Sequence, residues 1–238
     1  MAAISKVAAF AALWRVLGAA IDYQAFWMPI LFWIAIITMC VGNLVACVQK
    51  DVKRILGYSS IAHAGYILVG VLAHYKNVSV GENYTTLVYY LLSYVLMTVG
   101  AFAVISLGAK EGSEKTRLED LNGLYKRSPF AAICLWIFMF SLIGMPPSAG
   151  FFGKLFVFSD ALNAGLAPLA IVLAINSVIS IYYYAGIAWA AYVSDGTEEQ
   201  YQPRPISKGV AWACGLCVAG ILCVAVFQSQ IMPWLGAQ

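Results

Sequence analysis

The chain has 238 residues, of which 62% are hydrophobic and only 11% are charged, and its formal net charge is +3. Soluble domains carry about 25% charged residues, so a chain with a mean hydropathy of +0.82 has too little polar surface to fold in water. The small, scattered positive charge also argues against a nucleic-acid surface. We therefore expect an integral, multi-pass membrane protein, with residues 1–238 forming a single transmembrane domain in the lipid bilayer.

Seven apolar segments predict the membrane crossings. A helix needs about 20 residues to span a bilayer, and six of the segments fit one span each. The predicted fold class is therefore all-α, a polytopic transmembrane helical bundle with about seven crossings. The segments are residues 2–20, 26–48, 54–74, 85–108, 129–162, 166–192 and 209–230.

The segment 129–162 is too long for one uninterrupted crossing. Gly144, Pro146, Pro147 and Gly150 lie in its middle, and proline removes a backbone donor while glycine adopts dihedral angles that other residues avoid. We expect one broken crossing made of two half-helices. Unpaired backbone groups are tolerated at membrane depth only where protein or a wet cavity surrounds them. The break therefore indicates a functional position.

The connecting loops differ in positive charge. Alternation places residues 49–53, 109–128 and 193–208 on one side of the membrane, and 21–25, 75–84 and 163–165 on the other. The second set holds Lys76, with Arg15 near the same end of its helix. The positive-inside rule then puts the first set in the cytoplasm or the equivalent compartment of an organelle. The basic residues of the first set are Lys50, Lys53, Arg54, Lys110, Lys115, Arg117, Lys126, Arg127, Arg204 and Lys208.

Lysines inside apolar segments are candidate transport residues, because a charge at mid-bilayer costs at least a few kcal/mol. Lys154 follows the Pro-Pro break by seven residues, roughly 10 Å along a helix. We expect it deep in the bundle beside exposed backbone; the alternative is a lysine whose stem reaches an interface. Lys6 lies in the first apolar segment, either near the surface or, as we favour, at the centre of the membrane.

His63 is the third candidate. It lies ten residues beyond Lys53, about 15 Å deeper along a helix, and helical spacing puts Lys53, Ser60 and His63 on one stripe with Ser60 next to His63. A histidine titrates near neutral pH and can pass protons in both directions, and a hydroxyl both donates and accepts. We predict a proton relay here. The alternative is a buried histidine that only bonds a neighbouring helix.

Hydroxyl groups in the next helix are secondary candidates. Ser93 and Tyr94 could hold ordered water between the ionisable groups, although such residues more often serve helix packing. Tyr182, Tyr183 and Tyr184 could equally pack inside the helical bundle or lie at the membrane–water interface. All eleven Asp and Glu residues fall in loops or near segment ends, so we expect no carboxylate in this chain to tune Lys6.

The cysteines predict neither a metal site nor redox chemistry. All six lie in apolar segments rather than loops, and buried cysteine packs as a small hydrophobe. Cys214 and Cys217 form a Cys-x-x-Cys pair, but no second pair and no histidine lie near them in sequence.

Three stretches carry a resemblance to a known family: QKDVKRILGYSSIAHAGY at 49–66, RSPFAAICLWIFMFSLIGMPPSAGFFGKLFVF at 127–158, and INSVISIYYY at 175–184. They resemble subunit N of proton-pumping NADH:quinone oxidoreductase, respiratory complex I, in the family of antiporter-like membrane subunits. The match spans nearly the whole chain. Lysine at position 154 favours this group over the sister subunit M, which typically carries glutamate there.

The resemblance implies a fold of fourteen helices with two inverted repeats, each with a broken helix at its centre, of which this chain looks like the second half. Another polypeptide or a missing segment would then supply the first half. Lys6 would be the central connecting lysine, Lys154 the lysine of the second broken helix, and His63 a residue of the polar axis between them. The resemblance also implies that this chain holds no flavin, iron–sulfur cluster or quinone.

The predicted function is that of a non-redox membrane subunit of a proton-translocating NADH:quinone oxidoreductase. It would lie among the other membrane subunits of complex I, in a bacterial plasma membrane or an energy-transducing organelle membrane. One alternative is a subunit of a multisubunit cation/proton antiporter, which shares the fold. Another is a structural subunit that assembles a complex and has no proton path of its own. The lysine beside a proline-broken helix argues against the structural alternative, because packing alone does not need it.

Overall fold

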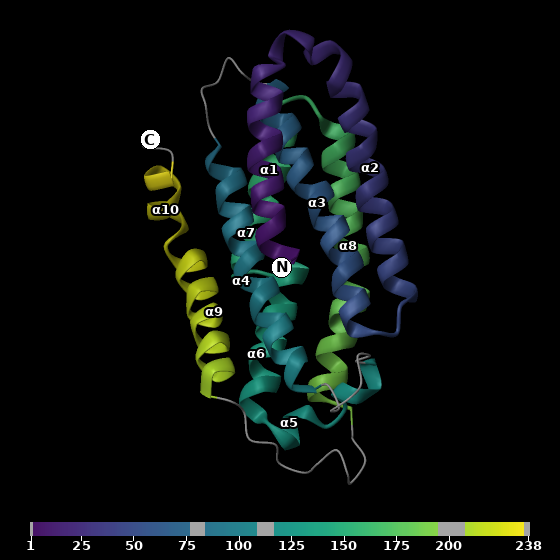
Figure 1. Cartoon of the computed structure of the whole chain (residues 1–238), viewed down its shortest axis with the longest axis vertical. Coiled ribbons are helices and arrows are strands. Elements are labelled where there is room, and N and C mark those ends of the chain that lie inside the picture. The colour runs from purple at the N-terminus through teal and green to yellow at the C-terminus, as the bar shows by residue number, and fades with distance from the viewer. Residues whose placement is uncertain (1, 77–83, 109–116, 195–207, 236–238) are drawn as a thin grey trace.

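Helices that lie side by side along the long axis make up the described part of the molecule (Figure 1). The structure is a computed structural model, and it describes residues 2–76, 84–108, 117–194 and 208–235. The long helices are α1 (Ala2–Ala19), α2 (Gln24–Val48), α3 (Val52–Lys76), α4 (Thr85–Gly108), α6 (Pro129–Ile143), α7 (Ala149–Asn163), α8 (Ala167–Tyr192) and α9 (Lys208–Val226). The short ones are η1 (Ile21–Tyr23), η3 (Leu118–Leu121), α5 (Leu124–Arg127) and α10 (Gln228–Leu235).

The prediction of an all-α polytopic membrane fold is confirmed. Within the described ranges there is no strand, and five helices are long and apolar enough to cross a membrane. They are Ile21–Val48, Val52–Lys76, Thr85–Ser106, Ala167–Tyr192 and Lys208–Val226. A count of seven crossings also needs α1 and the α6–α7 pair, so the number seven stays a prediction. The last segment was predicted to be one helix over 209–230. In the structure α9 stops at Val226, and a separate helix, α10, begins at Gln228.

Helix α3 is the central element of the bundle. Most of its residues are buried, and α2, α4, α7 and α8 all pack against it. By contrast α2 and α9 expose large apolar side chains, among them Trp33 and Trp212, as expected for surfaces that face lipid. A polar residue on α3 is therefore surrounded by protein, and its partners must come from the neighbouring helices.

The predicted break after α6 is present, but one of its residues was assigned the wrong role. Gly144 ends α6 with φ +85, and Ser148 caps α7 by accepting a hydrogen bond from the amide of Phe151. The Pro146–Pro147 peptide bond between them is cis. Gly150 lies inside α7 instead of interrupting it. A side chain there would collide with the carbonyl oxygen of Ser141, so glycine lets the two half-helices approach each other.

The described parts of the loops predicted to share one side, residues 49–53, 117–128 and 193–194, lie toward one end of the bundle (Figure 1). The amide of Leu118 donates to the carbonyl of Lys50 over 3.0 Å, and the amide of Gly123 donates to the carbonyl of Ser194 over 3.0 Å. These bonds join the α2–α3 turn, the η3–α5 segment and the end of α8. Lys110, Lys115 and Arg204 of the predicted positive side lie outside the described residues. Which compartment this end faces stays a prediction.

The contact between α2 and α3 yields a test of the packing. A Cβ atom at Gly42 would lie 2.6 Å from the backbone nitrogen of Ala62, so Gly42→Ala forces the two backbones apart. We expect a loss of about 1–3 kcal/mol, typical of overpacking, seen as a lower thermal unfolding midpoint of the purified chain. Gly57→Ala on α3 is the matched control, because nothing lies within 4 Å of its added carbon. Equal midpoints for the two variants would contradict the close approach.

Candidate functional site

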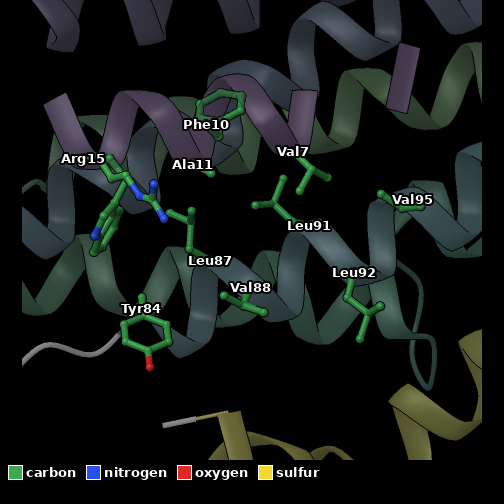
Figure 2. A pocket seen from close by; sticks show the side chains of 11 residues that line it. Val7, Phe10, Ala11, Arg15, Tyr84, Leu87, Val88, Leu91, Leu92 and Val95 are labelled. Atoms are coloured by element: carbon green, nitrogen blue, oxygen red, sulfur yellow. The ribbon is translucent and has the colours of Figure 1, made fainter. Parts of the chain in front are cut away.

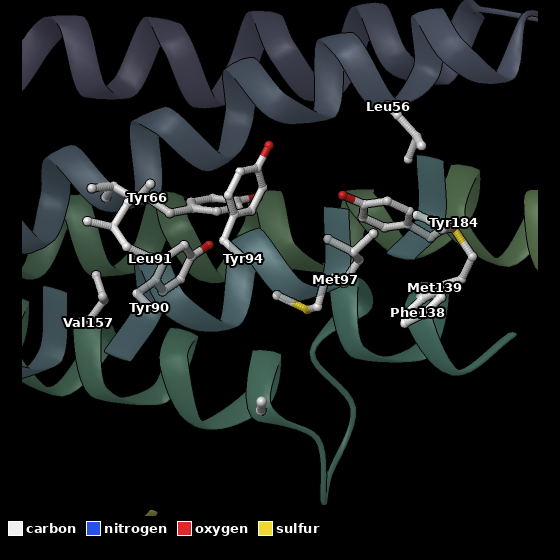
Figure 3. Close-up of a cluster of buried hydrophobic side chains, with 14 of the residues drawn as sticks. Leu56, Tyr66, Tyr90, Leu91, Tyr94, Met97, Phe138, Met139, Val157 and Tyr184 are labelled. Atoms are coloured by element: carbon white, nitrogen blue, oxygen red, sulfur yellow. The ribbon is translucent and has the colours of Figure 1, made fainter. Parts of the chain in front are cut away.

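His63 lies at the centre of a cluster of tyrosines. It is 2% exposed; its Nδ1 is 2.8 Å from the hydroxyl of Tyr90, and its Nε2 is 3.1 Å from the hydroxyl of Tyr184. The ring of Tyr94 lies 4.9 Å from the imidazole and that of Tyr66 lies 5.4 Å from it. Figure 3 shows these four tyrosines in the packed interior. Both ring nitrogens thus have hydroxyl partners, which can donate or accept as the tautomer requires.

Helical spacing explains why these side chains converge. Ser59, His63 and Tyr66 follow each other on α3 at intervals of four and three residues, and Tyr90 and Tyr94 are four apart on α4. Residues at these intervals share one face of a helix. The polar face of α3 therefore meets the polar face of α4, and Tyr184 from α8 closes the cluster by bonding both Ser59 and His63.

Lys6 reaches this cluster from α1. Its amine donates to the carbonyl of Ser60 and lies 3.3 Å from the hydroxyl of Tyr94. It also lies 4.9 Å from the centre of the Tyr94 ring, within the range of a cation–π contact. Ser60 thus contacts Lys6 through its backbone. The structure places Lys6 beside Ser60 of α3, and its central position in the membrane stays a prediction.

Lys154 lies in the helix break. It is 7% exposed, and its amine donates to the carbonyl oxygens of Leu142 at 3.0 Å and Ile143 at 2.8 Å. These are carbonyls of the last turn of α6, which lack partners within their own helix and carry the negative end of its dipole. The amine also lies 5.5 Å from the centre of the Tyr66 ring. The break therefore supplies the acceptors that a buried ammonium needs.

Two of the secondary candidates lie away from this cluster. The hydroxyl of Ser93 donates to the carbonyl of Tyr89 on its own helix at 2.9 Å, which is a contact within α4 rather than with His63. Lys53 is half-buried at the loop end of α3, ten residues before His63. Their proposed roles stay predictions.

A second polar network lies beside the first, and sequence reasoning missed it. The amide nitrogen of Asn43 is 3.0 Å from the hydroxyl of Tyr66 and 3.0 Å from Oδ1 of Asn176. The hydroxyl of Tyr183 donates to Oδ1 of Asn43 over 2.7 Å. A signal was available, because an asparagine within an apolar membrane helix needs a hydrogen-bond partner, often on another helix. Tyr184 carried no such signal, since it is one of three adjacent tyrosines.

An apolar groove of about 550 Å³ between α1 and α4 is separate from these polar groups. Figure 2 shows Arg15 and Tyr84 toward one end and aliphatic side chains such as Val88 and Leu92 along the rest. Its lining is unsuited to ions. Among the described residues no group of three or more His, Cys, Asp and Glu side chains could hold a metal ion.

The contacts connect the ionisable residues in a row. Tyr94 touches both Lys6 and His63, and Tyr66 lies between His63 and Lys154. Two amines and an imidazole, each able to hold and release one proton, are thus joined through phenol side chains inside a protein interior. Amines and an imidazole can take up and release protons, which makes this row a candidate proton path.

Comparison with known proteins supports the resemblance seen in the motifs. Residues 1–180 match the family model described as NADH:quinone oxidoreductase/Mrp antiporter, transmembrane. NADH-quinone oxidoreductase subunit N of Trichlorobacter lovleyi is 41% identical over 235 residues, which are 98% of this chain and 47% of that protein. The chain therefore spans about half the length of the curated relatives it matches.

Solved structures agree on the fold. A chain of respiratory complex I from Thermus thermophilus, with bound aureothin, is 34% identical and has a TM-score of 0.77 over 88% of this chain and 46% of that one. A chain of the Mrp complex from a Dietzia strain has a TM-score of 0.83 over 97% of this chain and 50% of that one, at 21% identity, which shows the fold alone. The chain therefore belongs to the NADH:quinone oxidoreductase/Mrp antiporter membrane family, and its resemblance to subunit N is confirmed.

Proposed function

We propose that this chain is part of a membrane subunit of a proton-translocating NADH:quinone oxidoreductase and conducts protons along Lys6, His63 and Lys154. The observation that carries this proposal is the amine of Lys154, which occupies a helix break and lies one tyrosine away from His63. Relatives named for this enzyme, at about 40% identity, support the assignment. Electron transfer would take place in other subunits, and this chain would hold no cofactor.

The path has a defined order in this proposal. A proton passes from Lys6 past the hydroxyl of Tyr94 to His63, crosses through neighbouring water beside Tyr66, and is held at Lys154. The carbonyls of Leu142 and Ile143 stabilise the charged amine there. Its release toward the other end of the bundle follows when those acceptors move, since the half-helices are joined only by residues 144–148.

The same resemblance leads us to propose the overall topology, the partners and the orientation of the chain. The chain forms seven crossings and corresponds to the second half of a fourteen-helix fold with inverted repeats; another segment or polypeptide supplies the first half. Other membrane subunits of complex I surround it in an energy-transducing membrane. The end that carries Lys50, Arg54 and Arg117 faces the cytoplasm or its organelle equivalent.

The first test is Lys154→Ala in vesicles that carry the assembled complex. We expect NADH-driven proton uptake to fall about tenfold or more, the loss typical when a positioned proton carrier is removed, with coupled NADH oxidation falling as well. Lys208→Ala, at the exposed start of α9, is the matched control and should keep both rates. If Lys154→Ala assembles and retains normal uptake and oxidation, the transport proposal fails and a structural role becomes the better account.

The two histidines provide a second test. His63→Gln keeps a polar side chain but cannot carry a proton at neutral pH, so proton uptake should drop by about tenfold or more. His74→Gln on the same helix is the control, because His74 packs against Trp14 with ring centroids 4.1 Å apart and lies about 16 Å along α3 from His63. Uptake is read from a pH-sensitive dye, and similar losses in the two variants would argue that His63 acts through packing alone.

Sodium dependence separates the proposal from a cation/proton antiporter. In vesicles where choline replaces sodium, proton uptake driven by NADH should keep its rate. A strict need for sodium, or a purified complex without redox subunits, would favour the antiporter alternative.

A further inference from the structure

A polar cleft of about 730 Å³ lies at the loop end of the bundle. The α2–α3 turn and the η3 segment supply charged side chains of both signs to its lining, and α8 supplies Tyr182 and Tyr183. The charged lining residues, which define this loop-end cleft, are Lys50, Asp51, Arg54, Arg117 and Glu119. A cleft of this size with polar partners has room for ordered water, and that water can reach the edge of Tyr183.

Tyr183 connects the cleft to a second tyrosine in the interior. It is 4% exposed, so only the edge of its side chain reaches the cleft. The ring of Tyr184 lies next to it with ring centroids 4.5 Å apart, and the two side chains also interact through their hydroxyl groups. Tyr184 is fully buried. The pair therefore carries hydroxyl groups from the wall of the loop-end cleft into the protein.

Tyr184 ends this line of hydroxyls at His63. Its hydroxyl bonds Ser59 and lies 3.1 Å from Nε2 of His63. On the other side of the ring, Nδ1 lies 2.8 Å from the hydroxyl of Tyr90, which can accept a proton from it. In that tautomer the lone pair of Nε2 faces Tyr184. The imidazole is then ready to accept a proton from the Tyr184 hydroxyl.

A second contact of Tyr183 leads to an amide. Its hydroxyl donates to Oδ1 of Asn43 over 2.7 Å. A carboxamide neither gains nor loses a proton near neutral pH, whereas a hydroxyl donates and accepts at once and can rotate between partners. Asn43 therefore holds the Tyr183 hydroxyl in place, and the contact that can carry a proton onward is the one with Tyr184.

We propose that Tyr183 and Tyr184 form an entry route by which protons pass from the loop-end cleft to His63. The Tyr183 oxygen takes a proton from water in the cleft and gives its own to the Tyr184 oxygen, which gives its own to Nε2 of His63. Each phenol ends with the one proton it began with, and the imidazole gains one. The entry route rests on the function proposed above and adds a way into the row from the loop end.

The test is Tyr183→Phe, which removes the hydroxyl and keeps the ring. In vesicles that carry the assembled complex, NADH-driven proton uptake should fall severalfold, although Lys6 still delivers protons to His63. Tyr184→Phe should give a similar loss, and it provides a second reading where Tyr183→Phe reduces assembly. Tyr182→Phe is the matched control, because Tyr182 lines the same cleft but is 72% exposed, and it should keep the parent rate.

The solvent isotope effect separates a lost relay from loosened packing. Without one of the two hydroxyls, proton entry becomes a slow step, so the ratio of uptake rates in H₂O and D₂O should rise above the parent ratio. A packing defect lowers uptake without raising this ratio. Normal uptake in the assembled variants, an equal loss in Tyr182→Phe, or a loss without a larger isotope ratio overturns the entry route.

Lys154→Ala, measured beside these variants, reports on the proposed function alone. If it keeps its rates of proton uptake and NADH oxidation, that function fails and the entry route fails with it. If it loses both rates while Tyr183→Phe and Tyr184→Phe behave like the parent, only the entry route fails.

Discussion

The hydrogen bonds from the Lys154 amine to the carbonyls of Leu142 and Ile143 are the contact on which the site depends. Lipid offers no partner to a backbone group, so a helix that ends inside a membrane must find acceptors and donors within the protein. Here a lysine from the second half-helix satisfies the last turn of the first. The same contact offsets the cost of burying the lysine. Each group would be unfavourable alone, and together they stabilise the break with the Lys154 amine inside it.

The packing of the bundle follows from the need to surround these groups with protein. Helix α3 is covered on several sides, and it carries His63, Ser60 and Tyr66, which touch Tyr90, Lys6 and Lys154 respectively. Glycine permits the closest approaches: Gly42 lets α2 approach the backbone of α3, and Gly150 lets α7 approach the last turns of α6. Small residues thus bring the helices close enough for short polar contacts, as is common between membrane helices.

The sequence was sufficient for the features that depend on single residues or local spacing. Long apolar segments predicted the helices, paired prolines predicted the break, and charge at membrane depth identified Lys154. Contacts across the bundle were harder, since in a uniformly apolar helix periodicity does not show which face meets which neighbour. Tyr184 bonds His63 from 121 positions away, and nothing in a run of three tyrosines distinguishes it from Tyr182, which is 72% exposed. Gly150 was misassigned for the same reason, because its role depends on a tertiary contact with Ser141.

The charges along the row also constrain how it can be filled. Lys6, His63 and Lys154 are all positive when protonated, and like charges in a low-dielectric interior repel strongly. No carboxylate is bonded to either lysine among the described contacts. Only Lys154 has the end of a helix as its acceptor, so a single proton held there is favoured over a fully loaded row. In the proposed path, a proton on Lys154 would oppose a second proton at His63 until the first has left, so this electrostatic coupling would limit transfer to one proton at a time.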